Sequence, residues 1–202
     1  MKFVYFDIGG VMIKDFSGTD KWQKMMADWT TDPDTIKKID DRFEETENEF
    51  CKGRDIDDFT EMLKREFGIE LPANYDIKQD FVSRFEKNER MWEIARNCQK
   101  KYKIGLLTAM YPGLLNEIKR QGLMPDIEWG IIVDSSIVGS NKPEKEIYIV
   151  AEKMTGVDPN EILFIDNKEK NLVVPREFGW QTFFFNSNDY EQSNKELKAF
   201  LG

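Results

Sequence analysis

Four polar residues stand at places where a folded chain could bring them together. Asp7, Thr108 and Asp166 each end a short apolar run, and Lys142 lies just ahead of a segment that begins at Pro143. The chain has no histidine, which removes Ser-His-Asp and Cys-His catalysis and every His-ligated metal site. Acid, base and nucleophile roles would therefore fall to groups such as carboxylates and lysine, and any metal would be a hard cation held by oxygen atoms.

Five short apolar runs predict the strands that carry these residues. The runs have apolar residues on both faces, which is typical of a parallel sheet covered by helices on both sides. They span residues 2–6, 103–107, 127–133, 162–165 and 181–185. In such sheets the ligand crevice lies at the carboxyl ends of the strands, where the winding reverses. Asp7, Thr108 and Asp166 would all point into that crevice.

Helical patterns lie between these runs. Residues 147–154 carry apolar side chains at the i, i+3, i+4, i+7 spacing of an amphipathic helix that begins near Pro143. Pro112 predicts the first residue of another helix, and Gly122 predicts its end. The alternation of strand and helix indicates an open α/β sheet.

Residues 14–84 interrupt this alternation. The interval between the first two runs contains no good strand and is far too long for a simple crossover. The tryptophans and methionines of residues 22–29 repeat at helical spacing, and Asp55 has the position of a helix cap. We therefore predict a helical insertion packed above a core formed by residues 1–13 and 85–202.

Composition narrows the class of protein and its partners. With 40% hydrophobic and 13% aromatic residues in 202, the chain is not entirely disordered. A net charge of −9 and scattered basic residues argue against a nucleic-acid partner and favour a small molecule.

Cys51 and Cys98 lack ligand-like spacing and predict buried thiols. The absence of a long apolar stretch or a signal-peptide pattern predicts no membrane partner and a cytoplasmic location. Nothing in the sequence indicates an oligomeric state.

In their order along the chain, these residues resemble the motifs of the haloacid dehalogenase-like hydrolases, in particular phosphatases with a helical cap after the first strand. Asp7 matches the first motif, Thr108 the second, Lys142 the third and Asp166 the fourth. The stretches NKPEKEIY and FIDNKEKNLVVPREFGW are similar to the surroundings of the last two motifs. The resemblance covers essentially the whole chain. It implies an α/β fold with a Rossmann-like doubly wound parallel sheet and an inserted α-helical cap, and phosphoryl chemistry that depends on Mg²⁺.

The resemblance also implies a role for each motif residue. Asp7 would attack phosphorus and form an aspartyl-phosphate intermediate. Lys142, the Thr108 hydroxyl and backbone N–H groups near Gly10 and Ala109 would hold the oxygens of the transferring group. The expected substrate is a small phosphorylated metabolite, and a sugar phosphate is one example.

The metal site follows from the same resemblance and from the charges. Asp7 and Asp166 would repel one another unless a cation lay between them. Mg²⁺ accepts carboxylate, carbonyl and phosphate oxygens. The implied protein ligands are the carboxylates of Asp7 and Asp166 and the backbone carbonyl of Gly9.

Two positions depart from the family pattern. Most of these phosphatases have a second Asp two residues after the nucleophile, which protonates the leaving group and later activates water, but this chain has Gly9 there. The fourth motif often has paired acids, whereas Asn167 follows Asp166. General acid–base catalysis is worth about 10²–10⁴-fold, a small part of the roughly 10²¹-fold acceleration that phosphate monoesterases approach. The missing acid should therefore slow the enzyme without extinguishing it, and the cap could supply a replacement.

Three functions are compatible with these residues. The first is a Mg²⁺-dependent phosphatase, which the acidic residue at position 166 favours. The second is a haloacid dehalogenase, in which Asp7 would displace halide from carbon without a metal. The third is a binding module that kept the fold but lost its acid/base, for which Gly9 and Asn167 are the evidence.

Overall fold

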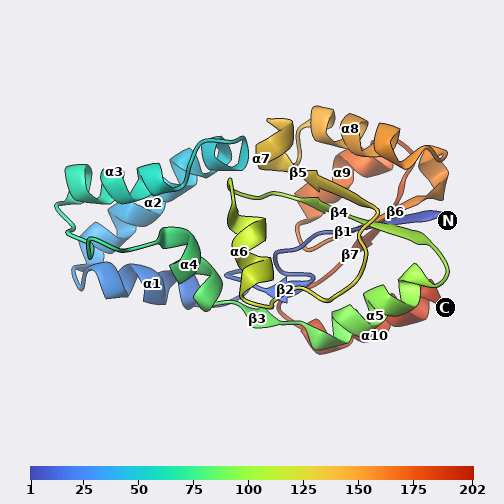
Figure 1. Cartoon of the computed structure of the whole chain (residues 1–202), viewed down its shortest axis with the longest axis horizontal. Helices are drawn as coiled ribbons and strands as arrows, with labels where there is room; N and C mark the ends of the chain where they lie inside the picture. Colours follow the sequence, from blue (N-terminus) through green and yellow to red (C-terminus); the bar gives the residue numbers. More distant parts are fainter.

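A five-stranded parallel sheet forms the centre of the computed structural model, which describes all 202 residues (Figure 1). The strand order is β5-β4-β1-β6-β7. The strands are β1 (Phe3–Phe6), β4 (Lys103–Thr108), β5 (Ile131–Asp134), β6 (Ile162–Asp166) and β7 (Gln181–Phe184). Because β1 is central and later strands add on both sides of it, the sheet is doubly wound. The predicted α/β fold is confirmed.

The register of the sheet sets the heights of the polar residues that end its strands. Phe6 of β1 is level with Leu106 of β4 on one side and with Ile165 of β6 on the other. The next backbone N–H, that of Asp7, donates to the carbonyl of Ile165 at 2.9 Å. Asp7 and Asp166 therefore leave adjacent strands at the same level.

Helices cover both faces of the sheet. On one face lie α8 (Lys145–Thr155) and α9 (Glu169–Glu177), and on the other lie α5 (Glu89–Gln99) and α10 (Tyr190–Leu201) (Figure 1). Side chains of β1 alternate between the two cores: Phe3 and Tyr5 pack on the α8 side, and Val4 and Phe6 pack on the α5 side. All four are at most 1% exposed, which explains why the strand is apolar throughout.

Four further helices form a separate lobe, at the left of Figure 1. They are α1 (Lys21–Trp29), α2 (Pro33–Cys51), α3 (Asp57–Phe67) and α4 (Ile77–Ser83), and all lie within residues 14–84. Side-chain caps begin two of them: Asp32 accepts the N–H of Thr35, and Asp76 accepts the N–H of Gln79. Gly68, at φ 67°, ends α3.

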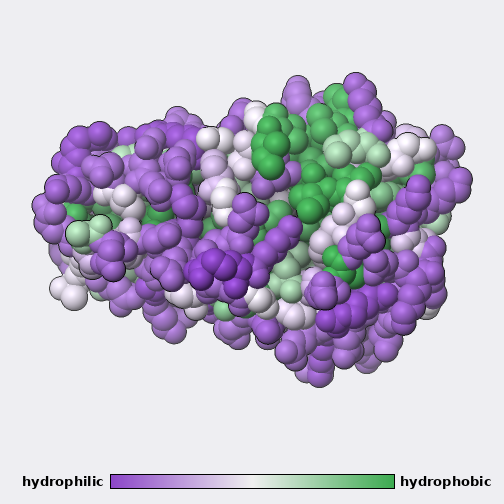
Figure 2. Space-filling model, viewed as in Figure 1, coloured by the Kyte–Doolittle hydropathy of each residue, from purple (hydrophilic) through white to green (hydrophobic).

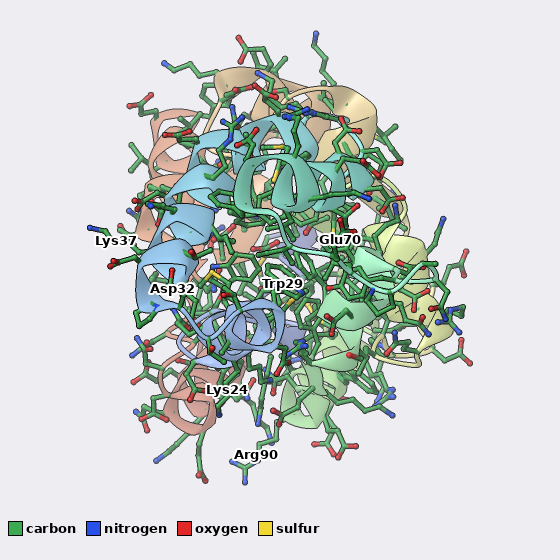
Figure 3. The ribbon with its side chains drawn as sticks, turned by 90° about the vertical axis from the view of Figure 1, so that its left-hand side faces the viewer. Lys24, Trp29, Asp32, Lys37, Glu70 and Arg90 are labelled. Carbon is green, nitrogen blue, oxygen red and sulfur yellow. The ribbon has the colours of Figure 1, made fainter.

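Aromatic rings fill the interior of this lobe. The ring of Trp22 lies 4.6 Å from that of Phe43, which lies 5.0 Å from that of Phe59. In Figure 3, which faces the lobe, Trp29 lies inside among the helices, whereas Lys24 and Lys37 extend away from it. The repeated tryptophans are therefore part of an apolar core.

Two short elements differ from the predicted ones. A two-residue antiparallel ribbon, β2 (Ile13–Lys14) with β3 (Glu86–Lys87), forms where the chain enters and leaves the lobe. A pair of residues has no detectable period, so the sequence predicts no strand there. The helix α6 (Leu114–Arg120) begins after Pro112 because Gly113 adopts φ 81°, which is outside the helical range.

The remaining short elements are α7 (Ser135–Val138) and a 3₁₀ helix at Pro159–Glu161. Hydrophobic residues gather on the surface near β5, α7 and α8 (Figure 2), and Ile137 of α7 is 84% exposed there. No helix combines the length and the apolar character that a membrane crossing requires.

Both cysteines are buried, as predicted, and each is 3% exposed. Burial raises the pKa of the Cys51 and Cys98 thiols to about 12. Because the thiolate is the reactive form, we expect 5,5′-dithiobis(2-nitrobenzoate) at neutral pH to label neither cysteine in the folded protein and both in urea. Rapid labelling of the folded chain would contradict this burial.

Candidate active site

Three charged side chains from distant parts of the sequence meet at the carboxyl end of the sheet. The Nζ atom of Lys142 lies 3.0 Å from Asp7 Oδ1 and 2.6 Å from Asp166 Oδ2. The same ammonium donates to the carbonyl of Leu107 at 3.3 Å. Lys142 is 5% exposed, Asp7 is 7% exposed and Asp166 is fully buried. The sequence-predicted residues at these three positions therefore form one cluster, which we call the charged trio.

The charges in the trio do not balance. Two carboxylates and one ammonium give a formal sum of −1 in a buried place. Burial raises the pKa of Asp7 above its ordinary range, and the Asp166 carboxylate acts in the same direction while Lys142 opposes both. Burial alone would lower the pKa of Lys142, but the carboxylates of Asp166 and Asp7 together raise it. Lys142 is therefore an ammonium ion, and the raised pKa of Asp7 reflects negative charge that a proton or a bound cation would offset.

Lys142 also changes how the repulsion between the two carboxylates is offset. The sequence predicts a metal ion between Asp7 and Asp166, and the structure has the ammonium of Lys142 between them. Like-charge repulsion is therefore reduced without a metal, and the need for a cation rests on the uncompensated charge.

Asp166 is held in one orientation by donors on α9 and the turn before it. Its Oδ1 accepts the backbone N–H of Lys168 at 2.7 Å. The side-chain amide nitrogen of Asn171 lies 3.1 Å from both carboxylate oxygens. The backbone carbonyl of Asn171 accepts the hydroxyl of Tyr148 at 2.8 Å. This network fixes the rotamer of Asp166 and the position that Lys142 takes.

Thr108 ends β4 next to the trio and has an unusual feature. Thr108 is fully buried, with 0% of its surface exposed, and its Oγ1 atom has no hydrogen-bond partner. A buried hydroxyl without a partner costs about 1–3 kcal/mol, so such an atom at a strand end favours a ligand that supplies the partner. Ala109 follows at the same edge of the sheet and is half-buried.

The two glycines after Asp7 leave room for side chains from elsewhere. A Cβ at Gly10, whose φ is 71°, would lie only 2.7 Å from the Cγ atom of Asn167. A Cβ at Gly9 would overlap with Oδ2 of Asp15 and lie 3.3 Å from its Cγ atom. Gly10 is therefore required by close packing and by its left-handed turn conformation, whereas Gly9 leaves the space that the Asp15 side chain occupies.

Asp15 is a polar residue of this site that the sequence does not single out. It lies in a segment with many acidic residues, and only the empty side-chain position at Gly9 hints that a neighbouring group fills that space. Its Oδ1 accepts the backbone N–H of Ser17 at 2.9 Å. Burial raises the pKa of Asp15, against the backbone N–H and the hydroxyl of Ser17 and the charge of Lys168.

The C-terminal half of α2 reaches the loops that carry the trio. Asn141 Nδ2 donates to Asn48 Oδ1 at 3.1 Å, and Lys52 Nζ lies 2.8 Å from Glu144 Oε1. The hydroxyl of Tyr111, which follows β4, donates to Glu47 Oε1 at 3.3 Å. These contacts join α2 to segments far away in the sequence, and no local pattern could have predicted them.

The trio and its surroundings offer oxygen atoms that suit a hard metal ion. No group of three Cys, Asp or Glu side chains is close enough to hold an ion by itself. Mg²⁺ is usually bound by one or two carboxylates together with substrate phosphates and water. Asp7 and Asp166, with their net negative charge, match that requirement, and the carbonyl of Gly9 could add a third oxygen. The residues present therefore fit Mg²⁺.

A groove lies elsewhere on the molecule. It has a volume of about 620 Å³ and is lined by residues of α5 and α10, among them Asn97 and Lys195. None of the trio residues lines it. The charged trio at the strand ends is therefore separate from this groove.

No protein-family model matches the sequence. A D-ribitol-5-phosphate phosphatase of Bacteroides thetaiotaomicron is 27% identical to the chain over 192 residues, and the match covers 91% of each protein. A bifunctional epoxide hydrolase 2 of Sus scrofa is 27% identical over 145 residues. That second match covers 67% of this chain but 25% of the pig protein, so the chain spans about a quarter of that relative's length.

Solved structures share the fold along most of the chain. A haloacid dehalogenase family enzyme of Bacteroides thetaiotaomicron, crystallised with magnesium and inorganic phosphate, superposes with a TM-score of 0.74 at 18% identity and covers 93% of this chain and 95% of its own. An L-2-haloacid dehalogenase superposes with a TM-score of 0.66 at 18% identity and covers 91% of this chain and 83% of its own. The chain therefore has the haloacid dehalogenase-like fold. The predicted resemblance to hydrolases of this group is confirmed.

Proposed function

We propose that the protein is a Mg²⁺-dependent phosphatase that hydrolyses a small phosphorylated metabolite. The observation that carries the proposal is the charged trio: a buried lysine within 3.0 Å of two carboxylates that end neighbouring parallel strands. The curated relative that covers 91% of the chain acts on D-ribitol 5-phosphate, so a polyol or sugar phosphate is the first substrate class to test.

Asp7 is the nucleophile in this proposal. Its Oδ1 is fixed by the N–H of Ile8 at 2.7 Å and by Lys142, which leaves Oδ2 to attack phosphorus in line with the leaving oxygen. Lys142 and the unpartnered Thr108 hydroxyl would hold the oxygens of the phosphoryl group, together with backbone N–H groups near Gly10 and Ala109. Hydrolysis of the aspartyl phosphate then restores the Asp7 carboxylate.

Mg²⁺ would be held by the carboxylates of Asp7 and Asp166 and the backbone carbonyl of Gly9. When bound, it would neutralise charge on the phosphoryl oxygens and on the trio. Asp166 also positions Lys142, because the two groups are 2.6 Å apart.

We further propose that residues 14–84 act as a cap over a catalytic core formed by residues 1–13 and 85–202. The contacts of Asn48 and Lys52 with the loop around Lys142 support this division. A cap in this place would exclude water from the trio and select the substrate.

Phosphate release from a panel of sugar and polyol phosphates, including ribitol 5-phosphate, tests the function. With Mg²⁺ we expect turnover of at least one member, and removal of the metal by EDTA should abolish it, with recovery when Mg²⁺ is added in excess. Turnover that EDTA leaves unchanged would contradict the metal-dependent mechanism. Chloride release from a 2-chloro acid without phosphate release would assign the protein to the dehalogenases, whose fold it shares.

A further inference from the structure

Hydrolysis of a phosphate ester needs a proton donor that Asp7 cannot be. The leaving oxygen of an alkyl phosphate is a poor leaving group unless it is protonated, and water attacks the aspartyl phosphate faster when a base removes its proton. The chain has no histidine, and Gly9, two residues after Asp7, has no side chain. Another side chain near Asp7 must therefore supply the acid and the base.

The turn after β1 brings one acidic residue back to that place. The carbonyl of Ile8 accepts the N–H groups of Val11, Met12 and Ile13, and Gly9 forms an isolated bridge with Ile13. The chain therefore folds back on itself within a few residues. Asp15 lies two residues beyond this bridge, and its Oδ2 lies too close to the Cβ position of Gly9 for both atoms to be present.

Three other acidic side chains near the site also accept hydrogen bonds, but none of them lies within 4 Å of the Cβ position of Gly9. Both oxygens of Asp166 accept hydrogen bonds, Asp134 caps α7 by accepting the N–H and hydroxyl of Ser136, and Glu47 accepts the hydroxyl of Tyr111. Asp15 Oδ1 is held by Ser17, and its Oδ2 faces Gly9. Asp15 is therefore the acidic side chain that lies against Gly9, two residues after Asp7.

We propose that Asp15 is the general acid and general base of this site, an assignment that rests on the proposed phosphatase function. In the first step a carboxylate oxygen of Asp7 bonds to phosphorus, the bond from phosphorus to the ester oxygen breaks, and that oxygen takes the proton of the Asp15 carboxyl group. In the second step the Asp15 carboxylate takes a proton from water, the water oxygen bonds to phosphorus, and the bond to Asp7 breaks. The products are the alcohol and phosphate, and Asp15 is protonated again.

Positions 9 and 15 are alternative places in the chain for one carboxyl side chain. The φ angle of Gly9 is not positive, in contrast to that of Gly10, so the backbone at position 9 can accept an aspartate. Only the side chain of Asp15 stands in its way. Moving the carboxyl group from position 15 to position 9 should therefore preserve the chemistry.

The test compares Asp15→Asn with the wild type on two esters, an alkyl phosphate from the substrate panel and p-nitrophenyl phosphate. Asparagine keeps the size of the side chain and can still accept the N–H of Ser17. We expect kcat/KM for the alkyl ester to fall by about 10²–10⁴-fold and kcat/KM for the nitrophenyl ester to fall much less, because nitrophenolate leaves without a proton. Intact-mass measurement should detect a phosphorylated chain during turnover of the nitrophenyl ester, because the breakdown of the aspartyl phosphate lacks a base.

The exposed Asp20→Asn, in the same loop, is the matched control and should behave as wild type.

The second arm is the relocation variant Gly9→Asp/Asp15→Ser, measured beside Asp15→Ser alone. Serine is small and retains an oxygen for the N–H of Ser17. We expect the double variant to recover most of the alkyl-ester activity that Asp15→Ser loses.

If Asp15→Asn lost activity equally on both esters without a phosphorylated chain, or lost none, the role of Asp15 would be overturned. A wild type that hydrolyses neither ester and takes up no phosphoryl group would instead overturn the phosphatase function itself.

Discussion

The Asp7→Asn variant should release no phosphate from any substrate of the wild type. Removal of the nucleophile in a covalent mechanism costs on the order of 10⁶-fold in kcat, because no other group can replace the attacking oxygen. Asparagine has the same shape and can still accept the N–H of Ile8, which donates to Asp7 Oδ1 at 2.7 Å. The measurement is phosphate release at saturating substrate and Mg²⁺, with thermal unfolding recorded on the same samples.

The same substitution should leave the fold at least as stable as before. It converts a trio with a formal charge of −1 into a balanced pair of Lys142 and Asp166, which are 2.6 Å apart. Asp134→Asn is a suitable control, since Asp134 also ends a parallel strand but caps α7 instead of joining the trio, and asparagine is an equally good cap. That control should keep most of its activity. Turnover by Asp7→Asn close to that of wild type would exclude Asp7 as the nucleophile.

The Lys142→Met variant should lose most of its activity and much of its stability. Without the ammonium, the carboxylates of Asp7 and Asp166 remain buried beside each other with no positive partner. Breaking a buried ion pair by removing one partner costs about 3–5 kcal/mol, and loss of a group that stabilises the transferring phosphoryl oxygens costs about 10²–10³-fold in kcat. Urea unfolding, without and with Mg²⁺, measures the first effect and phosphate release the second.

A surface lysine provides the control for this variant. Lys145 lies 3.2 Å from Glu177 with 61% and 54% of the two side chains exposed, so Lys145→Met should change the free energy of unfolding by less than about 1 kcal/mol. Combining Lys142→Met with Asp7→Asn should recover part of the lost stability, since one unpaired carboxylate is removed. If Lys142→Met unfolded at the same urea concentration as wild type, Lys142 would not be the group that offsets the two carboxylates.

The sequence predicts the trio because the relevant signals are local. Each strand is an apolar run with a polar residue at its end, and parallel strands place their carboxyl ends at one edge. Asp7 and Asp166 therefore follow from two short stretches and one rule of topology. Lys142 follows from the order of motifs, although the distances of 3.0 and 2.6 Å to its partners come only from the folded chain.

Other parts of the site depend on contacts that leave no trace in the local sequence. Asp15 has no distinguishing spacing, and its relation to Gly9 arises from a turn in which one carbonyl accepts three N–H groups. The contacts of Asn48 and Glu47 with the core join residues that are 93 and 64 positions apart. The ribbon of β2 and β3 is two residues long on each side. Features of this size are set by tertiary packing and not by periodicity.

Because Asp7 and Asp166 leave their strands at the same level, the charged trio and the correct pairing of β1 with β6 form together. Successive side chains of a strand point to opposite faces, so a slip of one residue between β1 and β6 would turn one carboxylate away from the other. The pairing of Phe6 with Ile165 thus specifies the sheet and the charged trio in a single step. A partly folded chain that contains the helices but lacks this register has no charged trio, and under the proposed function enzymatic activity would report directly whether the central sheet has formed correctly.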